Sequence, residues 1–115
     1  MKIYHNPKCS KSLTAKKILD ESGIAYQTHL YMDKPLSVVE LNQLLQKLKL
    51  SISEVIRTKE PVWKENFKNN EYSDEELIKI VSDNIKLLER PILEHKDKAV
   101  IARSGHAIEE IIDYN

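Results

Sequence analysis

The opening of the chain constrains the fold more than any other stretch, because a strand, a loop and a helix follow one another within residues 2–22. Apolar residues at positions 3–4 indicate a short strand, and a helix-compatible run starts at Ser10. Between them lies Cys9, the only cysteine of the chain. Unpaired backbone N–H groups converge at a helix N-terminus, and the helix dipole favours an anion there. This position predicts that Cys9 is a nucleophilic thiolate near neutral pH.

Two interpretations of Cys9 are open at this point. A lone cysteine is often a small buried hydrophobe, but polar residues flank Cys9, and this favours a reactive thiol. His5 lies four residues earlier on the same loop and would favour the thiolate further if it carried a proton. We interpret His5 as a residue that tunes Cys9 or orders the loop, rather than as a direct proton donor or acceptor.

Local signals place most of the helix ends. Gly23 is a natural C-terminal stop for a helix over residues 10–22. A serine followed three residues later by a glutamate is the signature of a capping box, and it occurs at Ser37, Ser51 and Ser73. These boxes predict one helix with Leu41, Leu44, Leu45 and Leu48 on its apolar side, a short helix ending near Arg57, and a third helix with Leu77, Ile80 and Val81.

The strands are predicted by apolar runs between turn residues. We expect strands at residues 2–4, 25–30, 90–94 and 99–102, a turn at 97–98, a last helix that includes residues 107–112, and an irregular or weakly helical segment at 61–71. The first two strands are joined by a crossover helix and are therefore expected to be parallel, whereas the last two form an antiparallel hairpin.

This order of elements predicts an α/β fold with α+β character. It reads β-α-β, then a helical insert, then β-β-α, with a mixed four-stranded sheet flanked by helices. Together with a reactive cysteine between the first strand and the first helix, it is the plan of the thioredoxin-like fold. At 115 residues the chain is expected to form a single domain over residues 1–115.

Arginine is rare in this chain, and its few occurrences are informative. Of 18 basic residues only three are arginines, Arg57, Arg90 and Arg103. A guanidinium group suits bidentate recognition of an oxyanion, and lysine replaces it poorly there. Arg90 directly precedes Pro91, and in a thioredoxin-like fold the proline before the third strand is usually cis and lies beside the active cysteine. The alternative is three unrelated surface arginines, some of them in salt bridges.

Composition excludes several classes of function. A formal net charge of +0 favours neither nucleic acid nor a membrane surface. We find no run long enough to span a bilayer and no signal peptide, and we expect a cytoplasmic monomer. His29, His95 and His106 show no metal-ligand spacing with one another or with Cys9, so we expect neither a metal nor a bound cofactor.

Four motifs in order identify a resemblance that covers essentially the whole chain. They are Ile-Tyr-His-Asn-Pro-Lys-Cys-Ser-Lys-Ser at residues 3–12, Val-Ile-Arg-Thr-Lys-Glu at 55–60, Glu-Arg-Pro-Ile at 89–92 and Val-Ile-Ala-Arg at 100–103. With them the sequence resembles the arsenate reductase family of the glutaredoxin-coupled type. The resemblance implies that Cys9 forms a thiol–arsenate adduct and that His5 favours its thiolate. It also implies that Arg57, Arg90 and Arg103 bind the oxyanion and that Pro91 is the cis-proline.

The resemblance also implies the reducing partners. In such enzymes glutathione attacks the adduct and glutaredoxin resolves the resulting mixed disulfide, and a chain with one cysteine needs an external thiol of this kind. Two other functions stay open. One is a glutathione-dependent thiol oxidoreductase that acts on another substrate. The other is a regulator like the Spx proteins, which bind RNA polymerase, although Ser12 replaces the second cysteine of their Cys-x-x-Cys switch.

Overall fold

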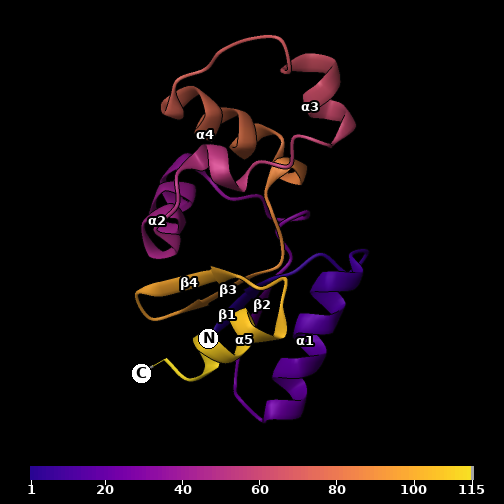
Figure 1. Cartoon of the computed structure of the whole chain (residues 1–115), viewed down its shortest axis with the longest axis vertical. Helices are drawn as coiled ribbons and strands as arrows, with labels where there is room; N and C mark the ends of the chain where they lie inside the picture. Colours follow the sequence, from indigo (N-terminus) through magenta and orange to yellow (C-terminus); the bar gives the residue numbers. More distant parts are fainter. Residues whose placement is uncertain (115) are drawn as a thin grey trace. The chain divides into compact units, whose positions relative to one another are not determined.

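Strands and helices both occur toward the two ends of the chain, and the middle is helical (Figure 1). The computed structural model describes residues 1–114. In chain order the elements are β1 (Lys2–Tyr4), α1 (Ser10–Ser22), β2 (Gln27–His29), α2 (Val38–Leu48), the 3₁₀ helix η1 (Ile52–Val55), α3 (Pro61–Asn66), α4 (Asp74–Asp83), the 3₁₀ helix η2 (Ile85–Leu87), β3 (Ile92–His95), β4 (Lys98–Ile101) and α5 (Gly105–Ile112).

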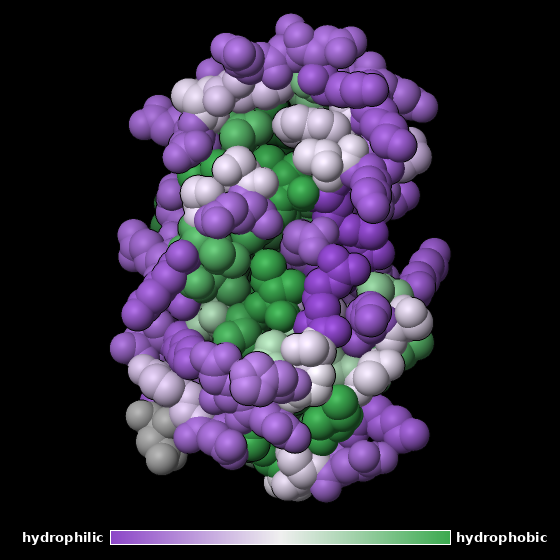
Figure 2. All heavy atoms as spheres, viewed as in Figure 1, coloured by the Kyte–Doolittle hydropathy of each residue, from purple (hydrophilic) through white to green (hydrophobic). Residues whose placement is uncertain are grey.

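The chain divides into two compact units. The sheet unit contains residues 1–34 and the chain from Arg90 onward, and the helical unit is Pro35–Glu89. The helical unit corresponds to the helical insert that the sequence predicts between the two β portions. Hydrophilic residues cover much of the surface in the view of Figure 2, with apolar residues showing between them.

The sheet unit contains a mixed four-stranded sheet in the order β2-β1-β3-β4. As predicted, β1 and β2 are parallel, with Ile3 opposite Thr28. Strand β3 runs antiparallel to β1 and pairs Leu93 with Ile3. β4 completes an antiparallel hairpin with β3. The arrangement confirms the thioredoxin-like α/β fold expected from the order of elements.

One core joins the sheet to two helices. Its buried members come from β1, α1, β3, the end of the hairpin and α5, so both helices cover the same face of the sheet. They are Ile3, Ala15, Leu19, Leu93, Ala102, Ile108 and Ile111. Because the residue at the centre of β1 is buried against α1, this core determines where the loop between that strand and that helix lies.

The predicted helix ends are confirmed. Capping boxes at Ser37 and Ser73 open α2 and α4 with both reciprocal hydrogen bonds formed, and at the start of η1 the N–H of Ser51 donates to the Glu54 carboxylate. Gly23 ends α1 with φ of 75°, a left-handed conformation that glycine adopts without a steric penalty. These signals act over three or four residues, and this is why they can be read without knowledge of the fold.

Four details of the structure differ from the sequence prediction or go beyond it. The hairpin turn is at residues 96–97 rather than 97–98, because the register pairs His95 with Lys98. The buried residues of α4 are Leu77, Ile78 and Val81, and Ile78 was not among the residues named for this helix from the sequence. The weakly helical segment contains a regular helix, α3, with a proline in its first turn. The short helix η2 was not predicted. Among residues 1–114, no helix combines the length and apolar character needed to cross a bilayer.

Candidate active site

Cys9 is the N-cap residue of α1. Its backbone N–H donates to the Asn6 carbonyl at 3.0 Å, and its carbonyl accepts the N–H of Leu13 at 3.0 Å. The thiol is unbridged and partly exposed. Cys9 therefore lies in a tight turn at the start of a 13-residue helix, where the ends of the aligned peptide dipoles favour an anion such as a thiolate or a bound oxyanion.

Ser12 anchors the loop before Cys9. Its side chain is fully buried, with 0% exposed, and its Oγ lies 2.6 Å from His5 Nδ1 and accepts the backbone N–H of Asn6 at 3.0 Å. The loop is closed further by the N–H of Lys8, which donates to Asn6 Oδ1 at 3.0 Å. One serine hydroxyl thus fixes both ends of the turn that presents the thiol.

His5 is buried at the end of β1, and its backbone N–H donates to the His29 carbonyl at 2.9 Å. Burial is the main factor that lowers the pKa of the His5 imidazole, and the nearby charge of Lys16 lowers it further. A ring whose pKa lies below the ordinary value of 6.5 is mostly neutral at pH 7. The contact with Ser12 and this neutral state support the interpretation of His5 as a residue that orders the loop.

The sheet brings three chain segments to one edge. Tyr4 at the end of β1 is opposite Ile92 at the start of β3, and Ile92 is opposite Ile101 at the end of β4. The segments that continue from these three positions therefore leave the sheet at the same edge. They carry Cys9 after β1, Arg90 and Pro91 before β3, and Arg103 after β4.

Pro91 and Arg90 lie at this edge. The peptide bond between them is cis, the conformation expected for Pro91, and the carbonyl of Pro91 accepts the N–H of Ala102 at 2.8 Å. Arg90 Nε is buried and has no hydrogen-bond partner among residues 1–114. A buried N–H donor without an acceptor is costly, and Arg90 Nε is such a donor.

A second helix begins at the same edge. Arg103 is exposed and is followed by Ser104, whose side chain accepts the N–H of Ala107 at 3.2 Å and caps α5. The N-termini of α1 and α5 thus both follow strands that end at this edge. Their dipoles add to the positive charge of the arginines there.

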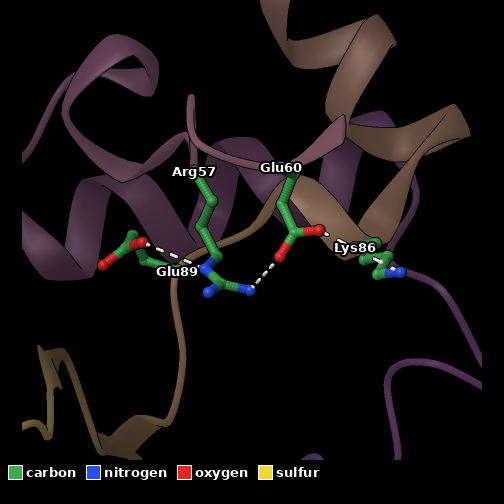
Figure 3. Close-up of polar contacts among 4 residues, drawn as sticks. All are labelled: Arg57, Glu60, Lys86 and Glu89. Atoms are coloured by element: carbon green, nitrogen blue, oxygen red, sulfur yellow. Dashed lines mark hydrogen bonds and ion pairs between the residues drawn. The ribbon is translucent and has the colours of Figure 1, made fainter. Parts of the chain in front are cut away.

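Arg57 belongs to the helical unit, where it follows η1. Its guanidinium lies between two carboxylates, with Nη1 at 2.5 Å from Glu60 Oε1 and Nε at 3.5 Å from Glu89 Oε1 (Figure 3). Lys86 Nζ approaches the other oxygen of Glu60 at 4.0 Å. Residue type and spacing in the sequence pointed to Arg57 but not to its two acidic neighbours.

Sequence reasoning also missed Ser12 as a structural residue of the site, because it was noted only as the replacement of a second cysteine. Its position, three residues after Cys9 on the inner side of α1, is the signal that could have found it, since Ser12, Ala15 and Leu19 are the buried residues of that helix. For Glu60 the signal is its spacing of three residues from Arg57.

The other histidines and the aromatic residues of the helical unit have separate surroundings. His29 Nε2 lies 2.6 Å from the Lys34 carbonyl, and His106 is exposed. Trp63 packs against Phe67 and Tyr72. Within residues 1–114, no three side chains of His, Cys, Asp or Glu form a group that could hold a metal ion.

Comparison with known proteins shows a consistent set of relatives. The ArsC family model matches residues 4–111. An arsenate reductase of Haemophilus influenzae is 39% identical over 112 residues, which cover 96% of this chain and 97% of the relative. An uncharacterised protein of Escherichia coli strain K12, YfgD, is 40% identical over 114 residues and covers 97% of this chain and 96% of its own.

Solved structures agree with the sequence relatives. An arsenate reductase from Vibrio cholerae superposes with a TM-score of 0.84 at 38% identity, covering 98% of this chain and 97% of that chain. The similarity therefore extends over both units of the chain and includes the segments that carry Cys9 and the three arginines.

Proposed function

Because the chain belongs to the ArsC family, we propose that it is an arsenate reductase that uses Cys9 as its nucleophile. The observation that carries the proposal is the position of Cys9 at the N-terminus of α1, at the sheet edge to which Arg90, Pro91 and Arg103 also belong. A thiol at a helix start beside guanidinium groups suits attack on a tetrahedral oxyanion.

The first step of the proposed reaction forms a covalent adduct. The Cys9 sulfur attacks the arsenic(V) centre, an S–As bond forms, and one oxygen of arsenate leaves as water after protonation. Arg57, Arg90 and Arg103 bind the remaining oxygens, since planar guanidinium groups match a tetrahedral oxyanion with parallel hydrogen bonds. His5 and Ser12 hold the loop so that the sulfur keeps its position.

The second step consumes an external thiol. Its sulfur bonds to the Cys9 sulfur, the S–As bond breaks with its electron pair on arsenic, and arsenic(V) is reduced to arsenic(III). One arsenate and two thiols thus give one arsenite, one disulfide and one water. Cys9 is the only cysteine of the chain, so the second thiol is external to it. We propose that this thiol is glutathione and that glutaredoxin reduces the mixed disulfide, as the resemblance to glutaredoxin-coupled enzymes implies.

A coupled assay tests the proposal. Oxidation of NADPH is followed with glutathione, glutathione reductase, glutaredoxin and arsenate, for the wild type, Cys9→Ser, Arg57→Lys and the exposed control Ser10→Ala. We expect arsenate-dependent turnover in the wild type and the control, none above background in Cys9→Ser, and at least a tenfold loss in Arg57→Lys, in line with the loss of a charge-assisted hydrogen bond.

Absence of arsenate-dependent turnover in the wild type would contradict the proposal. If the wild type shows no arsenate-dependent turnover while the glutathione and glutaredoxin reduce a reference disulfide, the proposed function is wrong. Reduction of a mixed disulfide by the wild type under those conditions would identify a glutathione-dependent thiol oxidoreductase in its place.

A further inference from the structure

Glu60 is a largely buried carboxylate that pairs with Arg57 and is also approached by Lys86. The Glu60 side chain is 12% exposed and that of Arg57 is 24% exposed. Glu60 is the N-cap residue of α3 but makes no capping hydrogen bond with its side chain. Its Oε1 instead accepts from Arg57 Nη1 (Figure 3). A buried carboxylate is costly unless it is paired, so the pair is maintained in the folded chain.

The backbone holds both partners in place. The N–H of Arg57 donates to the Leu87 carbonyl at 2.7 Å, and the N–H of Glu89 donates to the Val55 carbonyl at 2.8 Å. Ile56 and Leu88 form an antiparallel bridge between these segments. The N–H of Glu60 donates to the Arg57 carbonyl at 3.1 Å. The two carboxylates therefore approach the guanidinium from well-defined positions.

The carboxylates contact only part of the guanidinium. Glu60 contacts Nη1 and Glu89 approaches Nε, and neither contacts Nη2. A guanidinium has five N–H donors in one plane, so with Nη1 and Nε in contact with carboxylates the two N–H groups of Nη2 stay available to an incoming oxyanion. Arginine held in this way loses little side-chain entropy when the anion binds.

The negative charge of Glu60 also repels an anion that approaches Arg57. Arg57 and Lys86 carry two positive charges, and Glu60 and Glu89 carry two negative ones, so the four groups of Figure 3 are formally neutral. Removal of the Glu60 charge would leave Arg57 more attractive to an anion but less well oriented. When Glu60 is replaced, we therefore expect the Arg57 guanidinium to be less well oriented and the affinity for the oxyanion to be higher.

We propose that Glu60 is a positioning residue that orients the Arg57 guanidinium, so that its Nη2 edge binds the oxyanion and the oxyanion does not bind too tightly. The proposal rests on the proposed function for its substrate. It predicts that a substitution of Glu60 affects the two kinetic constants differently: kcat falls, and the KM for arsenate does not rise.

Two substitutions at Glu60 test the proposal, with Glu65→Gln as the matched control because Glu65 is an exposed carboxylate on the same helix. In Glu60→Gln the side-chain carbonyl still accepts from Nη1, but the negative charge is lost. We therefore expect only a modest loss of orientation, with kcat about threefold lower, and tighter arsenate binding, with KM about threefold lower. In Glu60→Ala the acceptor is lost, and we expect kcat to fall tenfold or more. Glu65→Gln is expected to match the wild type.

A second readout does not depend on turnover. In a Cys9→Ser background, which prevents the chemical step, the Arg57 Nε–H signal is followed by ¹H–¹⁵N NMR while arsenate is added. We expect a sharp signal that shifts with arsenate, and a signal broadened by exchange with water when Glu60→Ala is added. Circular dichroism and thermal unfolding verify that each variant is folded.

The outcomes separate the two proposals. If the wild type reduces arsenate but both Glu60 variants keep its kcat, KM and Arg57 signal, Glu60 has no positioning role and only this inference fails. A rise in KM with unchanged kcat would also overturn it. If the wild type neither reduces arsenate nor shows an arsenate-dependent shift at Arg57, the proposed function fails, and the role of Glu60 toward an oxyanion fails with it.

Discussion

The Oγ atom of Ser12 lies 2.6 Å from Nδ1 of His5, and the same oxygen accepts the backbone N–H of Asn6. His5 directly follows β1, and Ser12 lies in the first turn of α1. The contact therefore ties the strand side of the turn to its helix side, with Cys9 between them. The Cys9 thiol is positioned by a buried hydrogen-bond network in addition to the backbone of the turn.

Ser12→Ala is expected to destabilise the protein by about 1–3 kcal/mol, because it leaves the Asn6 N–H and the His5 ring without their buried partner. The same loss of anchoring is expected to lower arsenate turnover several-fold, since a small misplacement of a reacting group reduces the rate. Urea unfolding and the coupled assay measure the two effects.

Ser10→Ala provides the control for this substitution, because Ser10 lies on the same helix and its side chain is exposed. Its unfolding free energy is expected to stay within about 0.5 kcal/mol of the wild type. Equal stabilities of the two alanine variants would show that the Ser12 hydroxyl does not anchor the loop.

The stability of the protein is expected to fall in mild acid, in part because of His5. Its folded pKa lies below the ordinary value of 6.5, so below that value the unfolded chain binds a proton that the folded chain does not. The contribution of the neutral ring is therefore fully present above pH 6.5 and is lost as the pH falls toward the folded pKa. His95, whose pKa is lowered mainly by burial, acts in the same direction.

His5→Asn isolates the effect of His5, since the amide can replace Nδ1 toward Ser12 but does not titrate. Unfolding free energies are measured between pH 8 and pH 5. We expect the wild type to lose stability more steeply below pH 6.5, with a difference in slope of at most about 1.4 kcal/mol per pH unit. Parallel curves for the two proteins would contradict a lowered pKa of His5.

Arg90→Lys is expected to separate binding from stability. Arg90 Nε is buried without a partner within residues 1–114, so its removal breaks no hydrogen bond of the protein itself, and stability should change by less than about 1 kcal/mol. If the guanidinium binds arsenate, kcat/KM should fall about 10- to 100-fold, which corresponds to one charge-assisted hydrogen bond.

The coupled assay and urea unfolding measure these effects of Arg90→Lys, and Lys64→Arg on the exposed surface of α3 controls for the exchange of one cationic side chain for the other. A kcat/KM close to that of the wild type would remove Arg90 from the oxyanion site.

The two glycines of the chain are expected to respond to alanine with opposite signs. Gly23 has φ of 75°, and a Cβ there would meet nothing within 4 Å, so Gly23→Ala should cost about 1 kcal/mol through backbone conformation alone. Gly105 also has open space, lacks a positive φ and is the first residue of α5. Gly105→Ala should therefore be neutral or stabilise by up to about 1 kcal/mol.

Thermal or urea unfolding of the two glycine variants makes the comparison direct, because neither substitution introduces a clash. A loss of stability in Gly105→Ala as large as that in Gly23→Ala would show that the left-handed backbone is not the cause.

Sequence patterns predicted the parts of the fold that depend on near neighbours. The capping boxes and the glycine stop succeeded because each acts across three or four residues. The burial of Ile78 was not predicted because the side of α4 that is buried depends on its packing with α2, η1 and η2. The hairpin turn was misplaced by one residue because a left-handed residue, Lys96 with φ of 57°, occupies it, and lysine carries no turn signal.

In the candidate site, too, some features follow from local sequence and others only from tertiary packing. Local sequence is sufficient to place Cys9 at a helix start, His5 on its loop and Pro91 ahead of a strand, since strand, turn and helix signals act within a few residues. Tertiary structure alone buries Ser12 against His5 and places Glu89, 32 residues away, beside Arg57. These contacts depend on how the helix packs on the sheet and on the register of segments distant in the chain, and neither is encoded in any short stretch of residues.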